Sequence, residues 1–249
     1  MNASFTIFPA IDLRAGQVVR LQEGDPARQT VFSHDPAEMA YRFLSQGARW
    51  LHVVNLDGAF GEERSARQNL RAIEQMLEIT PEFSASLQTG GGMRSLQSIR
   101  ELLVRGVRRV VVGTMAMERP DLLEQAIREW GAERIAVSLD ARGGMVYVRG
   151  WQESGGISVE DAARLIQSCG VRWVVFTDIS RDGMQTGLAL EQASALADRF
   201  GFQVIASGGA RSLEDVRQAR ERGLAGVILG RALYEGAILL EEVLQEERC

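Results

Sequence analysis

The sequence predicts a (β/α)8 TIM barrel with a two-fold internal repeat of half-barrels. Three observations predict this α/β class. The chain has 249 residues, which is close to the length of about 250 residues typical of this barrel. Short apolar runs alternate along the chain with helix-length amphipathic segments, as expected for a parallel sheet. Motifs of the first half also recur in the second half in the same order.

Eight apolar runs are the candidate barrel strands. Most are continuous rather than alternating, as expected of strands that are covered on both faces. The runs span residues 5–11, 50–56, 85–89, 109–112, 134–139, 172–177, 202–206 and 226–229. Eight strand–helix units in a chain of this length favour a closed barrel over the alternative, a doubly wound open sheet.

Between these runs, apolar residues recur at spacings of three and four, which indicates helices with one buried face. One such stripe precedes Gly106 and another precedes Gly131, and glycine is common just after the end of a helix. Ser95 and Ser212 each stand before a helical pattern. Because a serine side chain can accept a hydrogen bond from a free helix amide, we expect helices to begin there.

The internal repeat joins four pairs of segments at nearly constant spacing. Residues 11–21 match 139–151, 51–61 match 173–183, 89–106 match 206–223, and 110–118 match 227–235. We therefore expect one domain, residues 1–249, made of half-barrels at approximately 1–125 and 126–249. A pseudo-twofold axis would place equivalent strand ends opposite each other across the barrel mouth.

Glycine-rich segments follow four of the predicted strands. They contain Gly91, Gly92, Gly113 and Thr114 in the first half, and Gly208, Gly209, Gly230 and Arg231 in the second. Glycine lets the backbone approach a ligand closely, and free amides at the start of a helix attract anions. Such glycines also serve in tight turns, but their occurrence on adjacent strands in both halves favours two phosphate sites.

Aspartates stand at several predicted strand ends. Asp12 and Asp140 end the first and fifth strands at equivalent positions of the repeat. Facing carboxylates can act as acid and base if their surroundings separate their pKa values. Asp57 and Asp178 follow the second and sixth strands, where bonding to loop amides is the alternative role. Asp182 precedes a glycine, which is also an ordinary turn signal.

Composition and motifs exclude several other classes of function. The net charge is −5 and no basic block is present, so we expect no nucleic-acid partner. No apolar run approaches a membrane span and no leader sequence is visible, so we expect a cytoplasmic protein. The cysteines and histidines lack metal-ligand spacing. We expect no metal, and we expect structural roles for His34 and His52.

The motifs together resemble a known enzyme family. FPAIDL, LHVVNLDGA, GGGMRS, VVVGT, SLDAR, FTDISRDG, ASGGARSLEDV and ILGRALYEG are similar to the phosphoribosylformimino-5-aminoimidazole carboxamide ribotide isomerase family of histidine biosynthesis. The resemblance covers nearly the whole chain. It implies a cofactor-free Amadori rearrangement of an aminoaldose to an aminoketose. The implied substrate is a small molecule with a phosphate at each end, and we expect a monomer.

The resemblance also implies roles for individual residues at the predicted strand ends. Asp12 would be the general base that removes the C2′ proton. Asp140 would donate a proton for ring opening, and Asp182 is the rival for that role. Thr177 would lie beside the sugar at the end of the sixth strand.

Four further residues complete the expected substrate contacts. Arg20 and Trp151 would come from mobile loops that close on the substrate, with Trp151 stacking on the imidazole carboxamide. The alternative for Trp151 is ordinary surface packing. Arg94, in the glycine-rich segment after the third predicted strand, and Asp178 are the other expected substrate-binding residues.

The sequence departs from the family pattern at two places. Position 55 is asparagine where the family usually has aspartate, and Met184 to Ala189 replace the usual Thr-Leu-x-Gly-Pro-Asn. The altered loop leaves two alternatives open, an isomerase that also accepts phosphoribosylanthranilate and a non-catalytic bisphosphate-binding barrel. A third alternative, the related cyclase subunit of imidazole glycerol phosphate synthase, would require a glutaminase partner.

Overall fold

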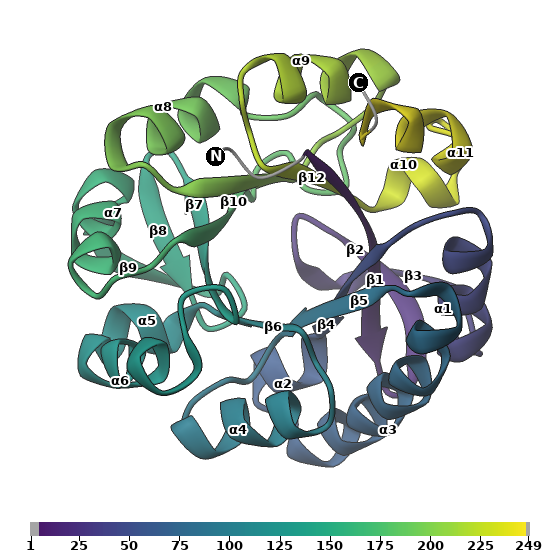
Figure 1. Cartoon of the computed structure of the whole chain (residues 1–249), viewed down its shortest axis with the longest axis horizontal. Coiled ribbons are helices and arrows are strands. Elements are labelled where there is room, and N and C mark those ends of the chain that lie inside the picture. Colours follow the sequence, from purple (N-terminus) through teal and green to yellow (C-terminus); the bar gives the residue numbers. More distant parts are fainter. Residues whose placement is uncertain (1–4, 248–249) are drawn as a thin grey trace.

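Parallel strands form a closed ring with helices around its outside (Figure 1). The computed structural model describes residues 5–247. The barrel strands are β1 (Thr6–Arg14), β4 (Trp50–Asn55), β5 (Ser86–Gly90), β6 (Arg109–Val112), β7 (Ile135–Arg142), β10 (Trp173–Asp178), β11 (Gln203–Ser207) and β12 (Gly226–Leu229). Pairing of β10 with β7 closes the ring. The predicted barrel is confirmed, and each strand coincides with one of the eight apolar runs.

Helices follow the strands and cover the outer surface of the barrel. The longer ones are α1 (Pro36–Ser45), α3 (Glu63–Ile79), α4 (Leu96–Val104), α6 (Pro120–Trp130), α7 (Val159–Ser168), α8 (Leu190–Phe200) and α9 (Leu213–Glu221). The short ones are α2 (Leu56–Phe60), α5 (Thr114–Glu118), α10 (Arg231–Tyr234), α11 (Leu240–Val243) and the 3₁₀ turns η1 (Thr80–Phe83) and η2 (Leu244–Glu247). Ser95 and Ser212 cap α4 and α9 in matching capping boxes, which confirms both predicted helix starts.

Each half carries an antiparallel extension at the carboxyl end of its first strand. The strands β2 (Gln17–Gln22) and β3 (Asp25–Ser33) continue β1, and β8 (Met145–Val148) and β9 (Glu153–Ser158) continue β7. The sequence repeat includes this region, for which the family resemblance implies mobile loops that carry Arg20 and Trp151. The ladder forms because a short turn follows each strand, which lets the chain pair with the strand it has just left.

The division into half-barrels at approximately residue 125 stays a prediction, and the helices show where whole strand–helix units end. Residue 125 lies inside α6, the helix that completes the fourth strand–helix unit. A division between whole units therefore lies after Trp130, just before β7 begins.

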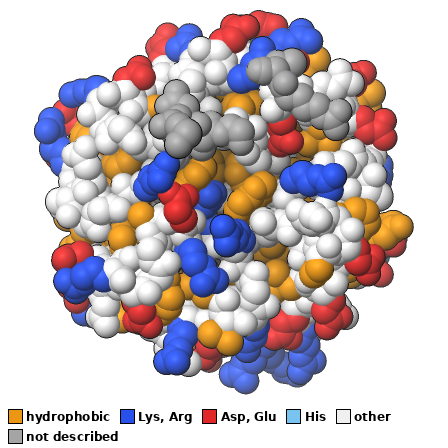
Figure 2. Space-filling model, in the orientation of Figure 1, with side chains coloured by type: hydrophobic (Ala, Val, Ile, Leu, Met, Phe, Trp, Pro, Cys, Tyr) orange, Lys and Arg blue, Asp and Glu red, His pale blue; other side chains and the backbone are white. Residues whose placement is uncertain are grey.

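Basic and acidic side chains are interspersed over the face drawn in Figure 2. The basic ones are all arginines, because the sequence contains no lysine.

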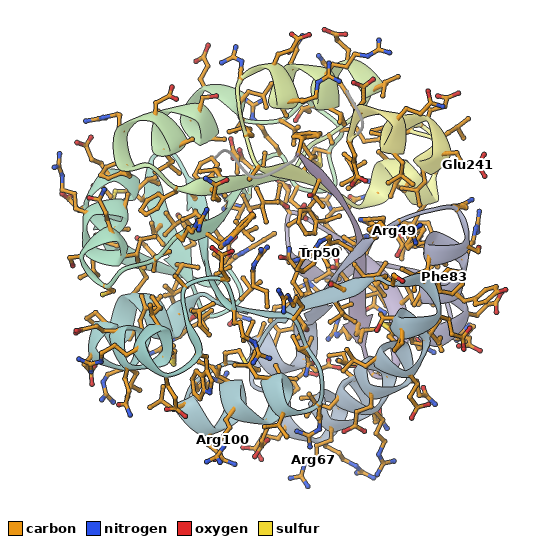
Figure 3. The ribbon with its side chains drawn as sticks, viewed as in Figure 1. Arg49, Trp50, Arg67, Phe83, Arg100 and Glu241 are labelled. Atoms are coloured by element: carbon orange, nitrogen blue, oxygen red, sulfur yellow. The ribbon has the colours of Figure 1, made fainter. Side chains whose placement is uncertain are left out.

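Apolar side chains form one core between the sheet and the helices and a second core inside the barrel. The inner core is closed at its amino-terminal end by Arg109, which begins β6. Its guanidinium carbon lies 3.7 Å from the ring centre of Trp173 and 4.9 Å from that of Trp50. Those tryptophans begin β10 and β4, and Trp50 is labelled near the middle of the ring in Figure 3.

Candidate active site

A cavity of about 610 Å³ opens at the carboxyl ends of the barrel strands. This is the end at which enzymes of this fold carry out their chemistry. Among the residues expected at the site, those that line the cavity are Asp12, Arg20, Gly91, Gly92, Arg94, Gly113, Thr114, Asp140, Trp151, Thr177, Asp182, Gly208, Gly209, Gly230 and Arg231. The fold thus brings together residues from both halves of the chain.

Asp178 does not line this cavity. Its Oδ1 accepts hydrogen bonds from the amide and hydroxyl of Ser180, and its Oδ2 accepts one from Arg181. Asp57 is fully buried and accepts hydrogen bonds from the amide of Ala15 and the side chain of Asn69. Both carboxylates therefore make the hydrogen bonds to neighbouring loop residues that were the alternative role, and substrate contact by Asp178 stays a prediction.

Asp12 forms a close ion pair with Arg20. The carboxylate lies near the end of β1 and its antiparallel partner across the hairpin is Val19, so Arg20 on β2 follows directly. Arg20 Nη1 donates to Asp12 Oδ2 at 2.5 Å, and Nη2 donates to the carbonyl of Ala10 at 2.6 Å. Burial raises the pKa of Asp12, and the adjacent guanidinium opposes that rise. Arg20 is thus placed to keep a buried carboxylate ionised.

Asp140 is held by neighbouring side chains at the end of β7. Its register partner on β10 is Thr177. The hydroxyl of Ser138 donates to Asp140 Oδ1 at 2.7 Å. Burial raises the pKa of Asp140, while hydrogen bonds from Trp151, Ser138 and Thr177 act in the opposite direction. The carboxylate is therefore desolvated and also held in a fixed orientation.

Asp182 is a third buried carboxylate of the site with a raised pKa. It lies in the loop after β10, and the carbonyl of Asp182 accepts a hydrogen bond from the amide of Glu23 in the β2–β3 turn. Burial and the negative charge of Asp12 raise its pKa to about 7, with a further contribution from Asp140 and an opposing one from Arg20. At neutral pH this group can hold a proton that an ordinary aspartate would have lost.

The two glycine-rich cradles have matching backbones. Gly113 and Gly230 precede the short helices α5 and α10 with φ/ψ of −111°/−94° and −108°/−110°. Glycine adopts such torsions without the steric cost of a Cβ. Gly91 has φ +99°, and a Cβ placed on it would lie 2.1 Å from the carbonyl oxygen of Asn55. The pseudo-twofold relation predicted from sequence thus extends to the backbone torsions.

Trp151 joins the two hairpins over the cavity. It lies in the β8–β9 turn with φ +69°, and its indole ring packs so closely on Gly24 of the β2–β3 turn that a Cβ there would meet the ring at 2.4 Å. Its side chain also bonds Asp140. The residue therefore contacts the site from a turn above it, which fits a lid better than surface packing.

Ser138, His52 and Arg149 also line the cavity, although sequence reasoning assigned none of them to the site. Ser138 lies two residues before Asp140 on a strand, so the alternation of side chains could have placed both on the inner face. His52 lines the cavity and its Nδ1 lies 3.0 Å from Gln88 Nε2. Burial and nearby Arg20 lower its pKa to about 3, so the ring is neutral. Arg149 also lines the cavity, from the same turn as Trp151.

Asn55, one of the departures from the family pattern, belongs to a buried hydrogen-bond network. Its Oδ1 accepts from the amide of Gly58 and from Asn69 Nδ2, and its own Nδ2 donates to the carbonyl of Ala66. An aspartate could not make this last donation. The asparagine is therefore compatible with its surroundings in this chain.

Comparison with known proteins identifies the family. The sequence pattern of the family described as "Histidine biosynthesis protein" matches residues 6–239. The chain belongs to this family. Among its relatives is a protein of Nitrobacter hamburgensis, 46% identical over 241 residues that cover 96% of this chain and 95% of the relative. That protein is named 1-(5-phosphoribosyl)-5-((5-phosphoribosylamino)methylideneamino) imidazole-4-carboxamide isomerase.

Two other relatives carry the same name. The protein of Anaeromyxobacter dehalogenans is 46% identical over 239 residues, which cover 96% of this chain and 98% of the relative. That of Rhodopseudomonas palustris is 45% identical over 241 residues, which cover 96% of both chains. Within residues 5–247, no helix is both long enough and apolar enough to cross a bilayer.

Proposed function

We propose that this chain catalyses the isomerisation for which its relatives are named, the rearrangement of an aminoaldose to an aminoketose on a substrate with a phosphoribosyl group at each end. The main support for this proposal is that a single cavity is lined both by two matching glycine-rich cradles and by three carboxylates, those of Asp12, Asp140 and Asp182. A phosphate bound at each cradle would hold the reacting sugar over the carboxylates, which lowers the entropic cost of the reaction.

The proposed chemistry breaks the bond between C1′ and the ring oxygen and otherwise moves protons, with no external oxidant or reductant. A carboxylic acid protonates the ring oxygen, the ring opens, and the substrate's own nitrogen forms a Schiff base with C1′. Asp12 then removes the C2′ proton to give an enolamine, which becomes the aminoketose when C1′ gains a proton and the C2′ hydroxyl loses one. The Schiff-base nitrogen comes from the substrate, which suits a chain without lysine.

We assign the proton donor to Asp182. Its pKa of about 7 lets it arrive at the reaction protonated at neutral pH. Burial raises the pKa of Asp140 as well, against hydrogen bonds from Trp151, Ser138 and Thr177; because Ser138 fixes one of its oxygens, we assign Asp140 the role of orienting the sugar and the indole. Closure of Trp151 over the cavity would exclude water from the ring-opened intermediate.

A turnover assay tests the proposal directly. Purified protein is given the formimino-aminoimidazole ribonucleotide alone, without metal, nucleotide or partner, and the ribulosyl product is followed by absorbance and chromatography. We expect conversion. Tight binding without conversion would favour the non-catalytic barrel, and absence of both would refute the two-phosphate site. Phosphoribosylanthranilate is assayed in parallel to define the breadth of substrates.

A cytoplasmic monomer stays our prediction. Light scattering coupled to size-exclusion chromatography, with and without substrate, measures the oligomeric state. Fractionation of expressing cells followed by the turnover assay locates the activity.

A further inference from the structure

Each short cradle helix ends with or is followed by a glutamate, and the two glutamates are equivalent in the sequence repeat. The segments VVVGTMAME and VILGRALYE align Glu118 with Glu235, each five residues after its cradle glycine. Glu118 is the last residue of α5, and Glu235 directly follows α10. Neither residue was among the expected site residues, and neither is needed for the proposed proton transfers.

Glu118 holds the turn that carries Trp151. Its Oε1 accepts hydrogen bonds from Arg149 Nε at 3.3 Å and from Arg149 Nη2 at 3.1 Å. The first residue of the same helix, Thr114, accepts a hydrogen bond at its Oγ1 from the amide of Arg149 at 2.8 Å. Arg149 has φ +54°, a conformation that costs free energy for a residue with a Cβ. These contacts hold the turn in that conformation.

Glu235 holds the loop that carries Asp182. Its Oε2 accepts a hydrogen bond from Gln185 Nε2 at 2.7 Å, and its Oε1 accepts one from Arg231 Nε at 2.6 Å. Arg231, the first residue of α10, also donates from Nη1 to the carbonyl of Gly183 at 2.8 Å. Gln185 has φ +52° and belongs to the segment that departs from the family pattern.

The hydrogen bonds follow the same pattern in the two halves. In each half, the residue after the cradle glycine bonds the backbone of an active-site loop, and the glutamate four positions later bonds a side chain of the same loop. We propose that Glu118 and Glu235 are positioning residues that couple phosphate binding at each cradle to the placement of one loop. Glu118 would set the Trp151 turn, and Glu235 would set the Asp182 loop.

This inference rests on the proposed phosphate cradles, and hydrogen–deuterium exchange separates the two. The probe is inorganic phosphate, and exchange is followed in peptides covering the cradles, residues 149–153 and residues 180–187. In the unmodified protein, phosphate should slow exchange at the cradles and slow both loops by about threefold, the size expected of exposed polar pairs. No slowing at the cradles would overturn the cradles and the coupling together.

The variants distinguish the two positioning residues, and each serves as control for the other. Glu235→Ala should remove the phosphate effect from residues 180–187 and leave it at residues 149–153, while Glu118→Ala should do the reverse. Glu124→Ala, which breaks an exposed ion pair with Arg128 on α6, should change neither. Cradle protection with both loop effects intact in the Ala variants would refute the coupling alone.

Glutamine substitution gives a second test that loss of folding cannot imitate. Glu118 accepts both bonds at one oxygen, so Glu118→Gln retains an acceptor and should keep most of the phosphate effect. Glu235 uses both oxygens, so Glu235→Gln must turn an amide towards one donor and should lose the effect. Equal behaviour of the two Gln variants would contradict the assigned contacts.

Discussion

Replacement of Asp182 by asparagine should abolish most activity and yet stabilise the fold at alkaline pH. The pKa of Asp182 is raised from 3.8 to about 7 by burial and by Asp12. The folded protein therefore binds this proton more tightly than the unfolded chain does. Stability that is fully present below pH 3.8 is lost as the pH rises through about 7, where the folded protein must give up the proton.

The magnitude follows from the size of the shift. Each pKa unit corresponds to about 1.4 kcal/mol, so a shift of about three units has an upper limit of about 4 kcal/mol. Asp182 retains partial access to the cavity, which reduces the value, and we expect Asp182→Asn to raise the free energy of unfolding at pH 8.5 by about 1–3 kcal/mol. Urea unfolding at pH 8.5 and at pH 5 measures the difference, which should shrink at the lower pH.

The same substitution tests the assignment of the proton donor. In the unmodified enzyme, kcat/KM should fall above pH 7 by about tenfold per pH unit, since the acid form is required. Asp182→Asn should lose this limb along with at least about 99% of the rate. Asp198→Asn, which removes an exposed carboxylate on α8, is the control. A variant that keeps the alkaline limb, or is less stable than the parent at pH 8.5, would refute the reasoning.

Three other substitutions test the base, a cradle and the buried network. Asp12→Asn should lower kcat by at least about a hundredfold while binding survives in equilibrium dialysis; near-normal turnover would show that the base is another group. Gly91→Ala places a Cβ at φ +99° and 2.1 Å from the carbonyl of Asn55, so chemical denaturation should show a loss of about 2 kcal/mol or more; an unchanged midpoint would contradict this close approach. In Asn69→Ala, the side-chain amide that donates to Asp57 and to the carbonyl of Leu13 is lost from a fully buried position. The free energy of unfolding, measured by thermal unfolding, should fall by about 2–4 kcal/mol. A fall of less than about 0.5 kcal/mol would mean that water replaces the amide.

The fold and the location of the site could be predicted because both depend on regular patterns. Barrel strands have carboxyl ends that meet at one rim, so glycines and aspartates at those ends must converge. The repeat then placed Asp12 opposite Asp140. The role of Asp178 could not be predicted in the same way, because position at a strand end does not fix the direction of a side chain in the loop that follows, where Ser180 and Arg181 bond its carboxylate.

Properties that arise from long-range contacts could not be predicted from sequence. The raised pKa of Asp182 depends on its burial, on Asp12 from β1 and on Asp140 from β7, against the opposing charge of Arg20 from β2. The contact of Trp151 with Gly24 joins turns more than a hundred residues apart in the sequence. A helix or strand pattern in the sequence describes residues that are close along the chain. Contacts between distant segments, such as that of Trp151 with Gly24, arise only when the barrel closes.

Arg109, whose guanidinium lies near the rings of Trp50 and Trp173, fills the amino-terminal end of the barrel interior. In the part of the chain that the structure describes, the cavity opens at the opposite end, so substrate enters and product leaves through the same opening. A product molecule that has not yet departed excludes the next substrate, and accumulated product should therefore raise KM and leave kcat unchanged. The rate at which product is supplied to a subsequent enzyme then depends on how quickly that enzyme lowers the concentration of free product.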